Sequence, residues 1–134
     1  MKRTFQGGCH CGAVRFAVDL DLSRGTDKCN CSICRLARAW FARASAEDFR
    51  LLSGAEDLTD YRFDTGQVHH YFCRRCGVRA FEWVDIPSED LRYYNIAIVC
   101  LADLDVDAVM AAPVKLQDGA NDRWDREPAD PRLM

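Results

Sequence analysis

The sequence has few of the features that mark membrane, exported or nucleic-acid-binding proteins. None of its apolar runs approaches the roughly 20 residues that a helix needs to cross a bilayer, so we expect no membrane partner. Residues 1–8 carry positive charge without an apolar stretch behind them, so no signal peptide is visible and a cytoplasmic location is predicted. Basic residues are not in excess, since 18 Lys and Arg face 21 Asp and Glu. The resulting pI of about 5.6 argues against nucleic acid as a partner.

Internal repeats and linker-like stretches are also absent from the sequence. A chain of 134 residues is long enough to bury a core without disulfide support, and we expect one domain over residues 1–134. Hydrophobic residues make up 49% and charged residues 29%, which is typical of a globular protein rather than a disordered one.

Helical periodicity is scarce, whereas short runs with the alternation of a half-buried strand recur along the chain. One short helix should begin near Ser32, which can serve as its N-cap, and residues 103–110 read as a helix or a loop. The nearly continuous apolar run at 94–101 is predicted to be the most buried strand. The sequence therefore predicts a mainly β, antiparallel fold with little helix. Strands are expected at 12–18, 39–44, 60–63, 68–72, 78–84, 94–101 and 113–116.

Cysteine, by contrast, is abundant: the chain has eight, and all but Cys100 fall in three groups. The groups are Cys9/Cys11, Cys29/Cys31/Cys34 and Cys73/Cys76. Short C-x-C and C-x-x-C spacings let neighbouring sulfurs converge on one ion, which is typical of thiolate zinc sites. The alternative is a disulfide framework, but C-x-C neighbours do not bond each other comfortably and four long-range bridges would be needed. A reducing cytoplasm favours metal.

Seven clustered thiols divide into four plus three, which predicts one closed and one open zinc site, or two Zn²⁺ per chain. Cys73 and Cys76, followed by Gly77, form the half-site of a zinc ribbon. Its other two sulfurs can come from either of the other groups. If the two outer groups pair, the middle group holds the second ion with three protein ligands, and a fourth position is open to water or an incoming thiol.

Other side chains near the thiols admit two interpretations. His69 or His70 can close the middle site as a fourth ligand and make it structural. Arginines crowd the ligands, either to compensate thiolate charge or to bind the carboxylate of an anionic substrate, for which Arg35 is the first choice. Cys100 lies in an apolar run and is expected to pack as a small hydrophobic residue. Candidates for the wall of a pocket are Trp40, Phe41, Trp83 and Trp124.

Three cysteine-bearing segments resemble the glutathione-dependent formaldehyde-activating enzyme family, which also includes centromere protein V. They are GGCHCGAVRF at 7–16, CNCSICR at 29–35 and HHYFCRRCGV at 69–78. The segment DGANDRWD at 118–125 is similar to the C-terminal part of the family, so the resemblance covers almost the whole chain. Asn30 departs from the histidine that many members have at its position.

The resemblance implies an antiparallel β-tent fold with two zinc ions. It assigns a structural zinc to Cys9, Cys11, Cys73 and Cys76, and a catalytic zinc to Cys29, Cys31 and Cys34. It also implies the activity for which the family is named, the joining of formaldehyde to glutathione to give S-hydroxymethylglutathione. Formally this is a carbon–sulfur lyase reaction run in reverse.

Three hypotheses about function follow from these patterns. The leading one is a zinc-dependent enzyme of the carbon–sulfur lyase type, whose partner is a small thiol such as glutathione. The second is a non-enzymatic, zinc-stabilised protein-binding module. The third is a redox or metal sensor in which the middle cysteines form a reversible disulfide. The fourth ligand of the second ion discriminates the first two, because an exchangeable ligand favours chemistry and a protein ligand favours a scaffold.

Overall fold

A computed structural model describes residues 1–134 and is mainly β. Ten strands form two sheets, whereas α1 (Ser32–Ala37) and α2 (Val106–Ala111) have six residues each. The prediction of a mainly β fold with little helix is therefore confirmed. No helix in the chain has the length and apolar character that crossing a membrane requires.

The smaller sheet has three antiparallel strands in the order β1-β2-β5. These strands are β1 (Arg3–Gly8), β2 (Arg15–Leu20) and β5 (Phe49–Ser53). The central strand buries four of its six side chains, including Phe16 and Val18 at 0% exposure. The expectation that residues 94–101 form the most buried strand is wrong, because β2 is covered on both faces along most of its length.

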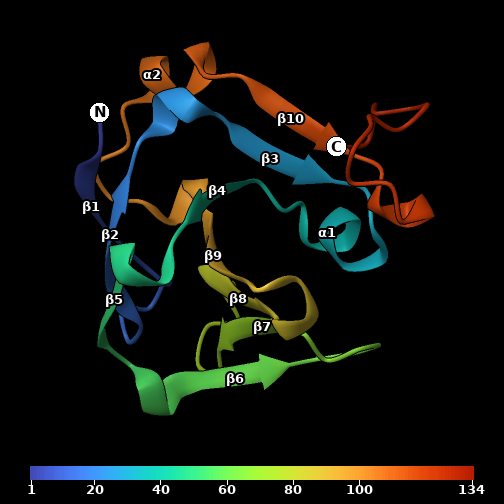
Figure 1. Ribbon diagram of the computed structural model, residues 1–134. Helices are drawn as coiled ribbons and strands as arrows, with labels where there is room; N and C mark the ends of the chain where they lie inside the picture. Colours follow the sequence, from blue (N-terminus) through green and yellow to red (C-terminus); the bar gives the residue numbers. More distant parts are fainter.

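The larger sheet has seven strands in the order β10-β3-β4-β9-β8-β7-β6 (Figure 1). Its pairs are antiparallel except β10 with β3, which run parallel and place Gln117 beside Cys29. This pair brings the last strand next to the middle cysteine group, because β3 ends at Cys29. Figure 1 shows β10 beside β3, at the edge of the sheet opposite β6. The strands are β3 (Thr26–Cys29), β4 (Phe41–Ala44), β6 (Leu58–Tyr61), β7 (Val68–Cys73), β8 (Phe81–Ile86), β9 (Leu91–Ala97) and β10 (Val114–Gln117).

Aromatic side chains join the two sheets in one core. Phe49 of β5 stacks on Tyr94 of β9 with ring centroids 4.1 Å apart, and it lies 4.7 Å from Phe81 of β8. Phe16 of β2 completes the group, at 5.4 Å from Phe49. Such pairs contribute beyond the burial of their area, so this cluster holds the sheets, and the cysteine turns at their ends, in fixed positions.

Three details differ from the sequence predictions. Helix α1 begins at Ser32 and Cys31 is its N-cap, one residue earlier than expected. The apolar run at 94–101 does not continue as a strand, because β9 ends at Ala97 and a 3₁₀ turn, Ile98–Cys100, follows. Strands β1, β3 and β5 were not expected, since their sequences RTFQGG, TDKC and FRLLS lack clear alternation.

Candidate metal centres

The two outer cysteine groups meet at one end of the sheets. Cys9 and Cys11 lie between β1 and β2, Cys73 ends β7, and Cys76 lies between β7 and β8. All four Sγ atoms lie within 4.8 Å of one another, with 3.6 Å from Cys9 to Cys11 and 3.7 Å from Cys11 to Cys73. Sulfurs about 2.3 Å from a tetrahedral zinc lie about 3.8 Å apart, whereas a disulfide spans about 2.05 Å. This donor set therefore fits zinc.

Local backbone structure shapes this first cluster. Gly77 has φ = 76°, a left-handed conformation that glycine adopts without strain, and its N–H donates to the Cys73 carbonyl at 2.7 Å. The Val14 N–H donates to Cys9 Sγ at 3.3 Å. Backbone hydrogen bonds from Cys11 and Val78 lower the pKa of the Cys76 thiol to about 6. The turn thus favours the thiolate form that metal ligation needs.

The middle group forms a second cluster at the junction of β3 and α1. Cys29 ends β3, Cys31 caps α1 and Cys34 lies in its first turn, and their three Sγ atoms lie within 4.8 Å of one another. Neither histidine belongs to this group. His69 Nδ1 lies 2.8 Å from Asp60 Oδ2, and His70 Nδ1 lies 3.0 Å from Glu82 Oε1.

Charge within the second cluster is unevenly shared. Hydrogen bonding to Cys29 and then to Cys34 lowers the pKa of the Cys31 thiol to about 2. Contacts inside the cluster raise the pKa of Cys34, through Cys29 and then Cys31, and that of Cys29, through Cys31. These contacts favour the thiolate form at Cys31 and the protonated form at Cys29 and Cys34. Three thiolates at this spacing require a positive ion, so this donor set also fits a metal.

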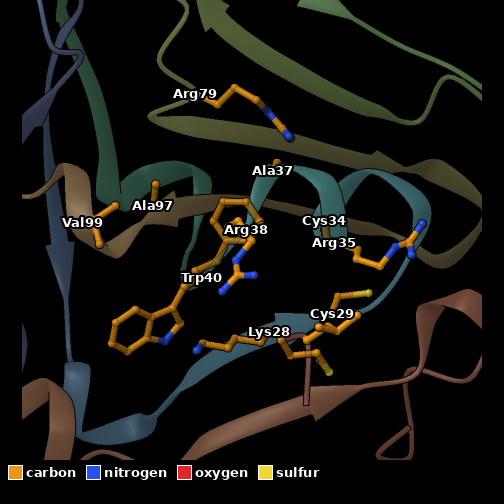
Figure 2. A pocket seen from close by; sticks show the side chains of 14 residues that line it. Lys28, Cys29, Cys34, Arg35, Ala37, Arg38, Trp40, Arg79, Ala97 and Val99 are labelled. Carbon is orange, nitrogen blue, oxygen red and sulfur yellow. The ribbon is translucent and has the colours of Figure 1, made fainter. Parts of the chain in front are cut away.

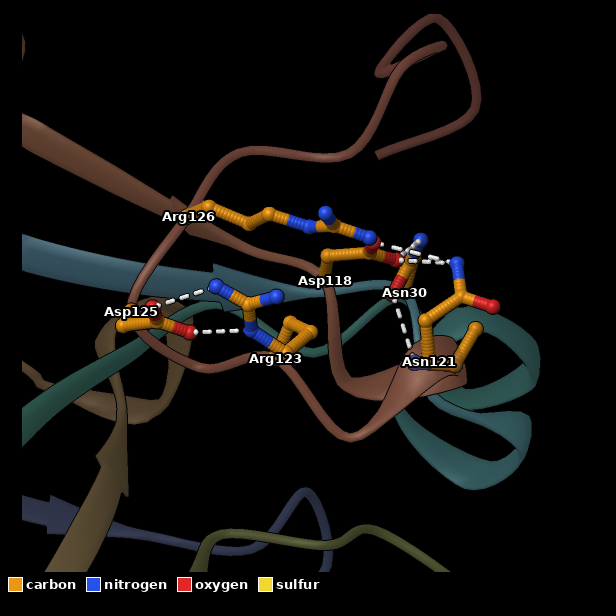
Figure 3. Close-up of polar contacts among 7 residues, drawn as sticks. Asn30, Asp118, Asn121, Arg123, Asp125 and Arg126 are labelled. Carbon is orange, nitrogen blue, oxygen red and sulfur yellow. Dashed lines mark hydrogen bonds and ion pairs between the residues drawn. The ribbon is translucent and has the colours of Figure 1, made fainter.

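A segment near the end of the sequence packs against the loop of the second cluster, and Figure 3 shows its contacts with Asn30. The Asn30 side chain, between two cysteines, donates to Asp118 Oδ1 at 3.0 Å and accepts from the Ala120 N–H at 2.9 Å. A Cβ atom on Gly119 would lie 2.5 Å from Cys29 Sγ. Asp118, Gly119 and Ala120 were not predicted to be part of a site. The parallel β3–β10 pair, which places them there, leaves no local signal in the sequence.

A cavity of about 280 Å³ opens beside Cys29 and Cys34 (Figure 2). Four cationic side chains line it, and none of the lining residues is Asp or Glu. Trp40 and Phe41, two of the predicted pocket aromatics, lie in its wall, whereas Trp83 and Trp124 do not. The lining cations are Lys28, Arg35, Arg38 and Arg79. A cavity with two thiols, an aromatic wall and four positive charges is suited to a small anionic ligand.

Arg79 differs from the other three cations because buried groups hold it. Its Nη2 donates to Glu82 Oε1 at 2.6 Å and lies 3.2 Å from His70 Nδ1. Glu82 is 3% exposed and also accepts from Asn95 Nδ2 at 3.2 Å. Arg35 is exposed and has no carboxylate partner. The cavity therefore has one cation held by a buried carboxylate, whereas Lys28 lies over the Trp40 ring at 4.9 Å and Arg38, like Arg35, is exposed.

Comparison with known proteins gives consistent matches. The family described as "Glutathione-dependent formaldehyde-activating enzyme" matches residues 4–116. A Halomonas elongata protein named "Putative glutathione-dependent formaldehyde-activating enzyme" is 34% identical over 79 residues, which are 53% of this chain. The match spans 50% of that relative's length. The crystal structure of a Rhodobacter sphaeroides protein has a TM-score of 0.68 at 33% identity, and covers 81% of this chain and 98% of that one.

Proposed function

The chain belongs to the glutathione-dependent formaldehyde-activating enzyme family, and from that premise we propose a zinc-dependent carbon–sulfur lyase. Its substrate would be a thiol–aldehyde adduct such as S-hydroxymethylglutathione. The observation that carries the proposal is the three-thiol cluster of Cys29, Cys31 and Cys34, of which Cys29 and Cys34 open on a cationic cavity. In the lyase direction the carbon–sulfur bond breaks, the hydroxyl proton passes to sulfur, and a thiol and an aldehyde leave. The synthetic direction reverses each change.

The two clusters would hold different ions. Cys9, Cys11, Cys73 and Cys76 supply four ligands, which close a tetrahedral site and give it a structural role. The three thiols of the second cluster leave one position free. A zinc ion there supplies a Lewis acid that can take a substrate thiolate or polarise a carbonyl.

The side chains of the cavity would bind and orient the substrate. Glutathione carries two carboxylates, which guanidinium groups recognise through paired hydrogen bonds. Arg79 is the fixed donor, because Glu82 already holds one of its nitrogens, and Arg35 can close over the ligand from the rim. Trp40 excludes water from one wall, held by its Nε1 hydrogen bond to Thr26 Oγ1 at 2.8 Å. These residues bring the sulfur of the substrate towards the thiol cluster.

A zinc-stabilised protein-binding module is the second candidate. A specific observation favours it: α1 and the end of β6 expose apolar side chains on one face. Leu36 is 79% exposed, Tyr61 49% and Phe63 40%, and they line a shallow groove together. In that function the second ion would need no exchangeable ligand.

Zinc content and thiol binding test the lyase proposal together. We expect two zinc ions per wild-type chain, and one in a folded Cys31→Ser variant. Glutathione should bind the wild-type protein, and S-methylglutathione, which keeps both carboxylates but blocks the thiol, should bind more weakly. Arg79→Met should weaken glutathione binding by about tenfold or more, as expected for a lost charged hydrogen bond.

The outcomes separate the candidates. Equal binding of glutathione and its S-methyl analogue would show that sulfur does not reach the metal. Two zinc ions without any thiol binding would favour the protein-binding module. One zinc ion in both the wild type and Cys31→Ser would show that the second cluster holds no metal, and would overturn the lyase proposal.

A further inference from the structure

We infer that Asp118 is the positioning residue of the second cluster: through Asn30 it fixes the loop that carries Cys29 and Cys31, and so sets how tightly that cluster holds its metal. The inference rests on the proposed function, in which that cluster binds zinc. Asp118 is 2% exposed and lies 88 residues from Asn30 in the sequence, so their contact is a tertiary one (Figure 3).

The Asp118 carboxylate is surrounded by donors. Asn30 Nδ2 donates to its Oδ1 at 3.0 Å, and Arg126 Nη2 donates to its Oδ2 at 3.2 Å. Asn121 Nδ2 lies 3.1 Å from Oδ1 and 3.0 Å from Oδ2. If residue 118 were asparagine, its NH₂ group would face at least one of these N–H donors. The position therefore requires an ionised carboxylate, which accepts and never donates.

The backbone around Asp118 makes it a rigid anchor. Its N–H donates to the carbonyls of Arg123 at 3.2 Å and Arg126 at 3.0 Å, while its carbonyl accepts from the Arg123 N–H at 2.9 Å. The segment thus folds back on itself around one buried residue. An anchor that is fixed on its own side can hold the C-x-C loop in position on the other.

The anchor reaches the ligands by two routes. The Asn30 side chain is bonded at both ends to the segment, through Asp118 and the Ala120 N–H. The Asn30 N–H also donates to the Gln117 carbonyl at 3.2 Å. Because residues 29 and 31 are ligands, a rotation of residue 30 moves two of the three sulfurs at once. Metal–ligand distances in well-formed sites lie within about 0.2 Å of their usual values, so even a small rotation would disturb the site.

The first cluster gives an internal reference. Its cysteines lie between β1 and β2 and between β7 and β8, and no hydrogen bond of Asp118 reaches these turns. A change at Asp118 should therefore affect one ion and leave the other as it was. Loss of fold would affect both.

The test compares Asp118→Asn with Asp125→Asn in the full-length, zinc-loaded chain. Asp125 lies in the same segment and pairs with Arg123 at 2.8 Å, but its side chain is 67% exposed and its side-chain hydrogen bonds go to Arg123 rather than to the cysteine loop. Zinc transfer to 4-(2-pyridylazo)resorcinol, followed by absorbance, resolves the two ions. We expect Asp118→Asn to weaken the second site by about 10- to 100-fold, as for other residues that orient ligands, and Asp125→Asn to change neither.

A charge exchange tests the mechanism. In the double variant Asn30→Asp/Asp118→Asn, the new carboxylate at 30 can accept from the amide at 118 and from the Ala120 N–H. We expect it to recover part of the zinc affinity, and cobalt substitution to restore the thiolate charge-transfer band that Asp118→Asn weakens. If Asp118→Asn does not fold, Asn30→Ala removes the link alone and should give the same selective loss.

The result that overturns the inference is a wild-type affinity at the second site in Asp118→Asn, or in Asn30→Ala if that variant replaces it. Equal loss at both clusters also overturns it, because the effect would then be one of global stability. A wild-type chain that holds one zinc ion overturns the proposed function and this inference together. Two ions in the wild type with an unchanged variant overturn this inference alone.

Discussion

Replacing Gly119 with alanine should empty the second cluster without altering any thiol. A Cβ at this position would lie 2.5 Å from Cys29 Sγ, 3.0 Å from Cys31 Cβ and 3.2 Å from Trp124 Nε1. Ordinary contacts begin at 3.4 Å, so the sulfur would move by about 0.9 Å if it alone relieved the contact. Zinc–sulfur distances in well-formed sites lie within about 0.2 Å of 2.3 Å, so a shift of this size is expected to break the ligation. Rotation of Cys29 alone gives no relief, because the Cys31 contact involves a Cβ that is fixed to the backbone.

Overpacking of this kind costs about 1–3 kcal/mol of global stability, so the Gly119→Ala protein should still fold. Zinc per chain, measured by inductively coupled plasma mass spectrometry, should fall from two to one. Gly66→Ala is the matched control. Gly66 has φ = 72° and open space around its Cβ position, so alanine there costs about 1–2 kcal/mol of backbone strain and touches neither cluster.

Two tightly held zinc ions in Gly119→Ala would refute this reasoning, since the sulfur would then have found another position without loss of ligation. Loss of zinc in both glycine variants would point to global destabilisation instead. The informative result is one ion in Gly119→Ala and two in Gly66→Ala.

Two further predictions concern the first cluster. Cys73→Ser should give unfolded or insoluble protein, because Cys73 is 1% exposed and the metal it would hold contributes about as much free energy as the net stability of a domain. A normal thermal melting curve of this variant would contradict the structural role. Asp57→Asn should destabilise the protein at pH 7, because Arg75 and then Arg74 hold the pKa of the buried Asp57 carboxyl below its usual value. A carboxyl whose pKa is lowered by folding stabilises the protein above its unfolded pKa of about 3.9, and this stabilisation is lost as pH falls through its folded pKa. The difference in urea midpoint between wild type and Asp57→Asn should therefore shrink towards pH 3. A difference that does not depend on pH would contradict this account.

Much of the fold and of both cysteine clusters could be predicted from local patterns. Alternation located β4, in which Ala42 and Ala44 are buried and Arg43 between them is exposed. The short runs predicted as strands at 68–72 and 113–116 correspond to β7 and β10. The division of seven thiols into four and three agrees with the two clusters, because short C-x-C and C-x-x-C spacings limit where sulfurs can meet. Family membership, first seen as a resemblance in three segments, is confirmed by the match over residues 4–116. The assignment of ligands, the zinc identity and the role of Arg35 remain predictions.

What sequence patterns did not predict depends on contacts between distant residues. The pairing of β3 with β10 joins two four-residue strands across more than 80 positions, and neither has the alternation that marks a strand pair. Arg79 is fixed by Glu82, three residues away, but also by His70 on another strand. In the sequence, Asp118 is one of several acidic residues in a polar segment, and only its tertiary contact with Asn30 distinguishes it.

The parallel pairing of β3 with β10 also orders events during synthesis. The first cluster can close once Cys76 has left the ribosome, whereas the second lacks its anchor until Asp118 has emerged 42 residues later. At about 5–20 residues per second this is a delay of about 2–8 s. During that interval the middle thiols are present without the segment that orients them. The two centres should therefore mature one after the other, and a nascent chain paused before residue 118 should carry a single tightly held ion.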